Sequence, residues 1–498
     1  MRVVGAGVTQ ERQAASIVWF RQDLRVADHA ALGAAVAAGG PVVPVYILDD
    51  ESAGAWRMGG AGRWWLHQSL VSLAATLESL GAPLVLRRGR AEAVLPALMA
   101  ETGAQVVHAG RMHEPWARAV DAAVERAAPG ALQLHRTSTL FDLDTIHTKT
   151  GGIYGVYTPF ARTLRERGAP APALPAPSCL HGAAARSDRL DDWGLLPTRP
   201  DWAGGFRKTW MPGEAAAAER LSAFVAKAVH GYDVGRNLPG QPGTSMLSAH
   251  LHWGELSPGQ VWSAAAAAAS ESQRRAGLDV YLGELLWREF AAYLLFHSPH
   301  LPEQPLRPRF ANLPARQAPA ELHAWQRGHT GVPIVDAGMR QLWHIGWMHN
   351  RVRMIVASFL VKHMLMPWRV GEDWFWNTLV DADLASNAAS WQWVTGCGID
   401  SQPFFRVFNP VSQGEKFDPD GAYVRRWVPE VAGLPDKWLH APWTAPDIVL
   451  RAAKLRLGHG LGHGLAHHYP RPIVDLAEGR QRALAAYRDT VREQEATE

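Results

Sequence analysis

The sequence predicts an α/β domain with a parallel, doubly wound sheet, followed by a second domain that is almost entirely helical. Two observations support this fold class. Short apolar segments alternate with amphipathic helical segments in the first part of the chain, and strand-like segments nearly vanish from Glu214 onward. With 498 residues, 47% of them hydrophobic and 19% charged, the chain is long enough for more than one core, and its composition excludes disordered and fibrous classes.

The α/β domain is expected over residues 16–143. Its predicted strands are short and apolar, and most of them precede a predicted helix. The strands are expected at 17–20, 42–48, 84–86, 106–108 and 132–134, and the helices at 28–38, at 63–80, from 91 and from 115. This alternation is typical of a Rossmann-like domain. No GxGxxG follows the first strand, so the sequence does not support a dinucleotide in the usual place.

Residues 144–213 are predicted to form an interdomain linker. Prolines are frequent in residues 168–177, and Asp, Pro and Gly are frequent from there to Gly213. Repeated prolines remove backbone donors and bias their neighbours away from helix. The helical domain is then expected over residues 214–489, with Pro258 in the first turn of one helix.

Charge and cysteine content narrow the class of protein. The 50 Lys and Arg residues against 47 Asp and Glu give a net charge of +3, so any nucleic-acid surface must be local. Only Cys179 and Cys397 are present, which excludes a disulfide framework. Residues 1–15 lack the apolar core of a signal peptide, and no apolar run approaches the roughly 20 residues of a membrane span. We therefore expect a soluble, cytoplasmic protein with no membrane association.

Four segments are candidates for chemistry, in a chain with an unusual 22 Trp against 14 Phe and 9 Tyr. In the first segment, a helix predicted over residues 281–296 places Glu284, Trp287 and Arg288 on one face, at i, i+3 and i+4. A Glu and an Arg at this spacing often form an ordinary surface pair. The neighbouring Trp287 favours a binding site over such a surface pair.

The second segment is a helix predicted from Asp336, with a stripe of large side chains that an amide interrupts. The stripe consists of Met339, Trp343, Trp347, Asn350 and Met354. Core packing accounts for Trp343. A buried Asn350, however, must find partners for its donors and its acceptor, and a heterocyclic ligand supplies both.

The third segment runs from Asp381 to Asn387 and is followed by Trp391 and Trp393. Its carboxylates suit Mg²⁺ or Ca²⁺ in principle, but the further ligands and the central Gly of a calcium loop are missing. We therefore expect a ligand that is aromatic and polar, with Arg353 pairing a buried carboxylate.

The fourth segment, residues 243–248, offers hydroxyl and backbone N–H groups at a predicted helix start, which suits a phosphate. Helix capping explains the same residues. A run of Gly and His at residues 457–468 is compatible with a metal tract. A solvated loop is the preferred interpretation, because no ligand spacing there is distinctive.

Taken together, these segments resemble the DNA photolyase/cryptochrome family from Ser16 to about Asp489. The resemblance rests on four motifs, Val18–Arg25, Gly346–Arg351, Asp381–Trp393 and Phe404–Pro410. His29 departs from the family pattern, in which Asn is usual. The resemblance implies an α/β Rossmann-like N-terminal antenna domain and an all-α C-terminal FAD-binding domain.

The resemblance also implies a U-shaped FAD that is held non-covalently. The residues that match phosphate contacts are Tyr232, Thr244, Ser245, Met246, Leu247 and Ser248. Those that match the surroundings of the flavin and the adenine are Tyr281, Arg288, Trp347, Asn350, Arg353, Asp381, Ala382, Asp383 and Asn387. Photolyases carry Asn opposite flavin N5 where plant-type cryptochromes carry Asp. Asn387 therefore favours a repair enzyme, because a neutral amide suits an anionic reduced flavin.

The family's cyclobutane-dimer enzymes use a carboxylic acid to hydrogen-bond the pyrimidine carbonyl, and Glu284 matches that position. Burial against aromatic rings should raise the pKa of Glu284. The (6-4) branch has His where Asn350 stands, so that lesion class is not expected. The residues that match the pocket walls and dimer contacts are Trp287, Trp393, Asn350 and Met354. Those that match DNA contacts are Arg236, Trp287, Arg351, Arg406 and Lys416.

The family reduces oxidised flavin along a route of tryptophans, and Trp391 and Trp368 match its proximal and middle members. Ala315 stands where the distal Trp is expected. Trp343, placed one helical turn from Trp347 on the predicted helix, is a candidate replacement. Packing explains Trp343 about equally well.

The antenna chromophore is predicted to be methenyltetrahydrofolate, with deazaflavin as the alternative. Its candidate contacts are Arg25, Glu114 and Trp116. Ordinary packing of strand-to-helix loops explains these three residues nearly as well.

The resemblance thus implies light-driven repair of cyclobutane pyrimidine dimers, with an electron passing from reduced FAD to a lesion flipped out of UV-damaged DNA. We expect a deoxyribodipyrimidine photo-lyase that acts as a monomer. The alternative is a cryptochrome-like blue-light photoreceptor that signals through a protein partner. The lesion-pocket residues and the short stretch after Asp489 favour repair. A light-independent flavin oxidoreductase would need a nicotinamide site, and none is visible in the sequence.

Overall fold

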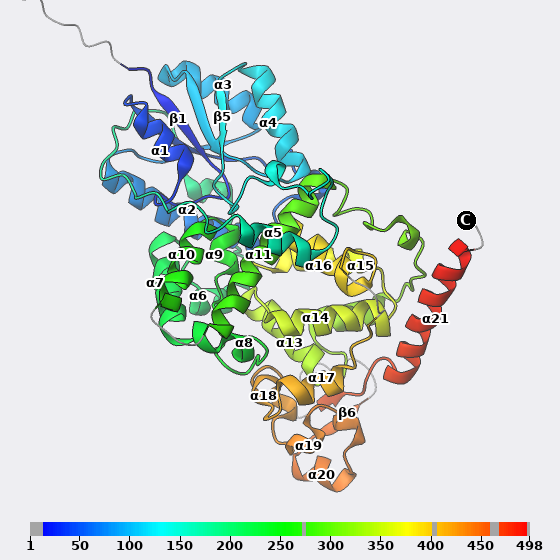
Figure 1. Cartoon of the computed structure of the whole chain (residues 1–498). Helices are drawn as coiled ribbons and strands as arrows, with labels where there is room; N and C mark the ends of the chain where they lie inside the picture. Colours follow the sequence, from blue (N-terminus) through cyan, green and yellow to red (C-terminus); the bar gives the residue numbers. More distant parts are fainter. Residues whose placement is uncertain (1–12, 271–274, 401–405, 459–467, 496–498) are drawn as a thin grey trace, which may run out of the picture.

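The computed structural model describes residues 13–270, 275–400, 406–458 and 468–495. Figure 1 shows a sheet-containing domain above a larger helical domain, with the last helix along one side. Both parts of the predicted fold class are confirmed. Within the described ranges, no helix is long and apolar enough to cross a membrane.

The sheet has five parallel strands in the order β3-β2-β1-β4-β5. The strands are β1 (Ser16–Phe20), β2 (Val42–Leu48), β3 (Val85–Arg88), β4 (Val106–Gly110) and β5 (Leu132–His135). β1 and β2 are buried along their whole length, as expected of parallel strands that are covered on both faces. The strand order reverses between β1 and β4, and sheets of this kind bind ligands at the carboxyl ends of the strands beside that point.

Helices cover both faces of the sheet. They are α1 (Ala30–Ala37), α2 (Gly60–Leu80), α3 (Ala91–Thr102) and α4 (Pro115–Ala127). Successive side chains of a strand point to opposite faces, so β1 contributes to two cores. Val18 and Phe20 belong to the core that contains α1 and α2. Ile17 and Trp19 belong to the core that contains α3 and α4.

His29, which departs from the family pattern, caps α1. Its Nδ1 accepts a hydrogen bond from the Leu32 amide at 3.0 Å, which is the role that an Asn side chain has at a helix N-cap. Its Nε2 lies 3.3 Å from Asp23 Oδ2. The substitution therefore preserves the start of the helix.

The segment predicted as a linker is more structured than expected. It contains α5 (Tyr157–Glu166) and α6 (Gly204–Thr209), whereas residues 168–177 form no helix or strand. Phe160 of α5 is fully buried, and its ring lies 5.0 Å from that of Phe290 in the helical domain. The buried positions of α5 recur with helical spacing, but the nearby prolines dominate the composition of the segment. The predicted domain boundaries remain predictions.

The helical domain contains fifteen described α-helices and one small two-stranded sheet. The helices are α7 (Glu214–Lys227), α8 (Tyr232–Gly235), α9 (Ser248–His252), α10 (Pro258–Ser270), α11 (Ala276–His297), α12 (Pro319–Arg327), α13 (Pro333–Ile345), α14 (Asn350–Ser358), α15 (Trp368–Thr378), α16 (Leu384–Thr395), α17 (Pro410–Phe417), α18 (Ala422–Trp427), α19 (Asp436–Leu439), α20 (Asp447–Ala452) and α21 (Leu476–Glu495). The strands are β6 (Arg456–Gly458) and β7 (His468–Pro470), and they flank residues 459–467 of the Gly/His run, which lie outside the described residues.

The single helix predicted from Asp336 is wrong, because the structure has two helices there. α13 ends at Ile345, Gly346 follows with φ +67°, and α14 begins at Asn350. A Cβ on Gly346 would lie 2.5 Å from the Phe206 ring, so backbone conformation and space both require glycine. The predicted stripe is consequently divided. Trp343 is 55% exposed, whereas Trp347 is 8% exposed.

Buried polar contacts join the two domains. Glu255 in the helical domain accepts hydrogen bonds from Trp65 Nε1 at 3.1 Å and from the Gly213 amide at 2.7 Å. Arg25, which is fully buried, donates from its Nη1 to the Gly254 carbonyl at 2.9 Å. These contacts hold α2 and the loop after β1 against the turn between α9 and α10.

Candidate functional site

The residues predicted to hold phosphates lie at the start of α8, which packs against α11, and in the turn that leads into α9. Tyr232 begins α8, and its ring lies 5.1 Å from that of Tyr281 on α11, edge to face. Burial raises the pKa of Tyr281 to about 12, although Ser245 opposes the shift. Ser248, the first residue of α9, accepts a hydrogen bond from Trp347 Nε1 at 3.1 Å.

The turn before α9 has an uncommon backbone. Met246 has φ +51°, and the Leu247 amide donates to Ser245 Oγ at 3.4 Å. Thr244 and Ser245 precede this turn and are only partly buried. Side chains that are far apart in the sequence are therefore neighbours here. We call this group, together with the nearby Arg353–Asp381 pair, the cradle.

Two carboxylates lie at the start of α16, on either side of Ala382. Arg353 Nη2 donates to Asp381 Oδ2 at 2.7 Å, so the predicted pairing of this arginine with a buried carboxylate is confirmed. Asp381 Oδ1 is buried and has no hydrogen-bond partner among the described residues. A buried acceptor in this state suits a ligand that brings its own donor.

Asp383 caps α16 by accepting from the Ser386 amide at 2.7 Å. Burial would raise the pKa of Asp383, but the neighbouring His252 and the charge of Arg288 outweigh burial and hold that pKa below its usual range. The carboxylate is therefore ionised, and it can accept hydrogen bonds from a ligand at any physiological pH.

Asn387 and Trp391 follow on consecutive turns of α16, and both are buried. Asn387 Nδ2 donates to the Glu372 main-chain oxygen at 3.1 Å, which holds the amide against α15. The Trp391 ring lies 5.1 Å from Phe375 and 6.4 Å from Trp325. An aromatic cluster thus begins one helical turn from the amide.

Glu284 on α11 lies in a cluster with arginines that come from other elements. Its Oε1 accepts from Arg236 Nη1 at 2.5 Å, and its side chain is 30% exposed. Burial raises the pKa of Glu284, while the charges of Arg236 and Arg351 act in the opposite direction. The net upward direction agrees with the prediction from the sequence.

Two further cations complete what we call the mouth, the surface formed by Arg236, Glu284, Arg351 and Lys416. Arg351 on α14 donates to Asn237 Oδ1 at 2.5 Å, and its guanidinium lies 4.4 Å from the centre of the Phe417 ring. Lys416 Nζ lies 5.3 Å from the same ring. The structure therefore brings together three of the predicted DNA contacts and the predicted lesion contact.

Aromatic rings flank the mouth. Trp287, which is 37% exposed, stacks on Tyr157 with ring centres 3.7 Å apart and planes 7° apart. The Tyr157 hydroxyl donates to the Gly283 carbonyl at 2.8 Å, so the stack is fixed to α11. Trp393 is partly buried, and its Nε1 donates to the Asp400 carbonyl at 3.1 Å.

Asn350 is exposed, so the predicted buried amide is wrong. It starts α14 after the turn at Gly346, and this position places it on the surface rather than within a packed stripe. Met354, one turn further along, lies with its sulfur 3.7 Å from Arg351 Nη1. Arg406 is exposed beside residues 401–405, which lie outside the described part together with the first two residues of the 404–410 motif.

The candidate electron route is only partly assembled. Trp368, the first residue of α15, is partly buried at the edge of the core that contains Trp391, and Ala315 is exposed. The expectation that Trp343 lies one helical turn from Trp347 is wrong, because Gly346 separates them. Trp343 instead stacks on Trp374 of α15, with ring centres 5.9 Å apart and planes 8° apart.

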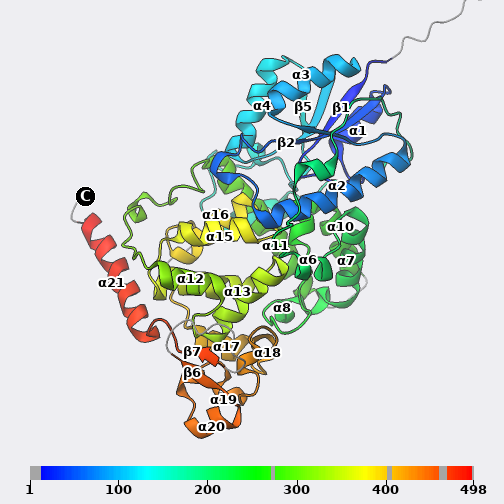
Figure 2. The same ribbon diagram turned by 180° about the vertical axis from the view of Figure 1, so that it is seen from behind.

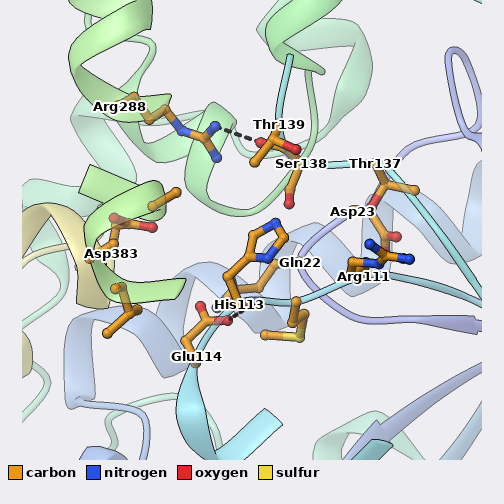
Figure 3. A pocket seen from close by; sticks show the side chains of 15 residues that line it. Gln22, Asp23, Arg111, His113, Glu114, Thr137, Ser138, Thr139, Arg288 and Asp383 are labelled. Atoms are coloured by element: carbon orange, nitrogen blue, oxygen red, sulfur yellow. Dashed lines mark hydrogen bonds between the residues drawn. The ribbon is translucent and has the colours of Figure 1, made fainter. Parts of the chain in front are cut away.

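A small pocket lies between the loops of the sheet domain and the helices α11 and α16 (Figure 3). Figure 3 shows Arg288 and Asp383 on the helical side and His113 and Glu114 on the other. Arg288 Nη1 donates to the Ser138 carbonyl at 2.6 Å. Burial and the surrounding arginines lower the pKa of His113 to about 4, so this ring is neutral at pH 7.

A neighbouring, larger pocket lies at the carboxyl ends of β1 and β2 and reaches the turn before α16. Glu114 and Trp116 both line it, among several other tryptophans. Burial and the nearby Asp383 raise the pKa of Glu114. Arg25 lines neither of these pockets, and its guanidinium donates to the carbonyls of Ala27, Asp28, Thr137 and Gly254.

Two family models match the chain. Residues 16–178 match DNA photolyase, and residues 281–489 match the FAD binding domain of DNA photolyase. A deoxyribodipyrimidine photo-lyase of Agrobacterium fabrum is 49% identical over 478 residues, which cover 95% of this chain and 97% of that protein. The chain belongs to the DNA photolyase/cryptochrome family.

Both branches of this photolyase/cryptochrome family are among the relatives. Cryptochrome-1 of Arabidopsis thaliana is 36% identical over 486 residues, which cover 94% of this chain and 69% of that protein. The crystal structure of a bacterial class III photolyase from Agrobacterium tumefaciens matches with a TM-score of 0.91 and 47% identity, over 97% of this chain and 99% of that one. A Synechocystis cryptochrome structure matches with a TM-score of 0.85 and 26% identity, over 95% and 99%.

Several contributors to this photolyase/cryptochrome site were missed from the sequence. Tyr157 lies in the segment interpreted as a linker, and Asn237 and Phe417 carry no distinctive spacing. Trp374 was one of many tryptophans. The only sequence signal for it is the Trp-Phe-Trp run at residues 374–376 of α15, which packs against α16.

Proposed function

We propose that this family member repairs cyclobutane pyrimidine dimers in DNA, with light driving an electron from reduced FAD to the lesion. The observation that carries the proposal is the arrangement at the mouth, where a partly exposed carboxylate lies between arginines from separate elements. The carboxyl can hydrogen-bond a flipped base, while the arginines neutralise the phosphates beside it.

The cradle fits FAD, because it combines hydroxyls at a helix start with an unpartnered buried acceptor on Asp381. We assign the phosphates to Tyr232 and residues 244–248 and the flavin and adenine to the other predicted contacts. Bound FAD in its reduced form supplies the electron that light excites. The chain's part is to hold Asp383 ionised, to fix Asp381 in its ion pair with Arg353, to place the amide of Asn387 beside the flavin, and to exclude water from Trp391.

Glu284 has a proposed role that depends on its proton. A neutral pyrimidine that enters the mouth separates Glu284 from Arg236 and removes water, and both changes raise the pKa of Glu284 further. The protonated carboxyl then donates a hydrogen bond to a pyrimidine carbonyl and stabilises the negative charge that the lesion gains. Arg236 is thereby freed for a DNA phosphate.

The remaining lesion contacts are proposed around this group. The Trp287–Tyr157 stack offers a rigid apolar wall, and Asn350 offers an exposed amide at the start of α14. Met354 and Trp393 are proposed as further contacts, and Arg351, Arg406 and Lys416 as phosphate contacts. Flipping a damaged, poorly stacked pair costs less than flipping normal bases, which favours the lesion over intact DNA.

The electron route and the antenna are also proposals. We assign Trp391 and Trp368 to the route, and Trp343 to its exposed end through the stack on Trp374. The tryptophan-rich pocket beside Glu114 and Trp116 is the proposed antenna site, for methenyltetrahydrofolate or, alternatively, deazaflavin. A cytoplasmic location and a monomeric state remain predictions.

The alternative is a blue-light photoreceptor, which the similarity to a plant cryptochrome keeps open. The test is to illuminate purified, reduced holoprotein with an oligonucleotide that contains a thymine dimer and to count restored thymines, with a dark control. Light-dependent restoration supports repair. Bound FAD that changes redox state in light while the dimers persist would replace the proposal with the photoreceptor.

A further inference from the structure

A second surface combines aromatic rings with positive charge, away from the mouth. It is a hollow, open to solvent, that is lined by residues of α12, α13, α15 and α18 and by residue 329. α12 and α13 face the viewer in Figure 2. None of the residues proposed to contact the lesion or the DNA lines it.

Tryptophans form one wall of the hollow. Trp343 is 55% exposed, and its ring is nearly parallel to that of Trp374, which also lines the hollow. Trp427 lines another part, with the His344 ring 5.8 Å away. Core packing does not account for an indole that is more than half exposed. A paired, exposed indole is instead a surface on which a planar heterocycle can stack.

The charge of the hollow is positive. Arg327 and Arg426 line it, both are exposed, and neither pairs with a carboxylate among the described residues. Arg426 lies 5.3 Å from the centre of the Trp427 ring. Arg340 also lines the hollow, but Glu430 neutralises it at 2.8 Å. No Asp or Glu is among the described residues that line the hollow.

We propose that this hollow is a nucleotide-binding site, in which the base stacks on Trp343 and the phosphate pairs with Arg327 and Arg426. Stacking accepts any base, because every base has a π face, and guanidinium groups bind phosphate oxygens with two parallel hydrogen bonds. The same chemistry is offered by a free mononucleotide and by a nucleotide within single-stranded DNA. The site is independent of the lesion pocket.

The test is equilibrium dialysis of the FAD-loaded protein in the dark, at low salt, with radiolabelled AMP. Adenosine, inorganic phosphate and an oligodeoxyadenylate serve as competitors. We expect adenosine and phosphate to compete at least about tenfold less well than AMP, because each lacks one of the two recognised groups. An oligonucleotide that competes better than AMP identifies the single strand as the source, and one that competes worse identifies the free nucleotide.

Variants localise the site. Arg327→Gln combined with Arg426→Gln should weaken AMP binding at least about tenfold and leave dimer repair unchanged. Trp343→Ala should weaken it by a similar factor, whereas Trp343→Phe keeps a ring and retains most of the affinity. Arg480→Gln, an exposed arginine on α21, is the matched control and should change nothing. The absorption spectrum of bound FAD confirms that each variant is folded.

Three results would overturn the proposal. The first is that the wild type does not bind AMP, and the second is that the wild type and the double arginine variant bind AMP equally. The third is that dimer-containing DNA displaces AMP to the same extent from the wild type and from the variants of the hollow. The last result would locate the nucleotide in the lesion pocket.

Discussion

At the mouth, arginines and aromatic rings surround the carboxyl group of Glu284, whereas the described residues that line the hollow include arginines and aromatic rings but no acidic side chain. The carboxyl group neutralises part of the positive charge and provides a donor once it is protonated, which suits a neutral base carbonyl. In the hollow, Arg327 and Arg426 pair with no carboxylate among the described residues, and their charge suits a phosphate. One acidic residue, rather than the number of arginines or rings, therefore determines which ligand each region favours.

The two regions belong to consecutive helices. α13 carries Trp343 into the hollow, and α14 carries Arg351 into the mouth. The left-handed residue Gly346 makes this division possible, because a continuous helix would place these side chains along one stripe.

The largest expected effect concerns the positive charge of the mouth. Arg236→Gln combined with Arg351→Gln should lower affinity for dimer-containing DNA by at least about 100-fold, since each charge-assisted phosphate contact contributes about 1.5 to 3 kcal/mol. The slope of log K against log salt should become shallower by about 1.8, which corresponds to two phosphates. Filter binding over a salt series measures both quantities. The hollow variant Arg327→Gln with Arg426→Gln is the control, and an equal loss in that variant would contradict the division between the regions.

The next effect concerns the turn that separates the regions. Gly346→Ala should destabilise the protein by about 1 to 3 kcal/mol, because a Cβ would meet Phe206 and the left-handed backbone disfavours alanine. Urea unfolding followed by circular dichroism measures the change. Gly204→Ala is the control, because a Cβ there meets nothing within 4 Å. Equal stability of the two variants would show that the turn tolerates a side chain.

A third effect compares the mouth with the ion pair between Arg353 on α14 and Asp381, which precedes α16. Asp381→Asn should lower affinity for FAD about tenfold, since it weakens the buried ion pair with Arg353 and removes half of the acceptor capacity offered to the ligand. Fluorescence titration of the apoprotein with FAD measures it. Asp192→Asn, on the exposed surface of the linker segment, is the control. Unchanged FAD affinity would remove Asp381 from the cradle.

Local periodicity and motifs were enough to predict the sheet and the parallel direction of its strands. They were also enough to predict the pairing of Arg353 with a carboxylate. These features follow from the spacing of residues that are close in sequence, or from a motif with a characteristic geometry.

Other features depend on contacts between distant segments. The stack of Tyr157 on Trp287 joins residues 130 positions apart, and no spacing signals it. Asn350 was expected to be buried because the break at Gly346 was not recognised as a helix end, although glycine is common there. Arg25 matched an antenna position, but the domain contacts that occupy its guanidinium are tertiary.

The role of the Glu284 proton is tested most directly by the pH dependence of dimer repair. The yield of restored thymines per absorbed photon should fall as pH rises through the raised pKa of Glu284, because ionisation removes the donated hydrogen bond. Glu284→Gln keeps a donor at every pH and should give a flat profile, and Glu284→Ala should lower the yield about threefold at low pH while FAD and DNA remain bound. Identical profiles for the wild type and Glu284→Gln, together with an undiminished yield in Glu284→Ala, would contradict the role of this carboxyl group.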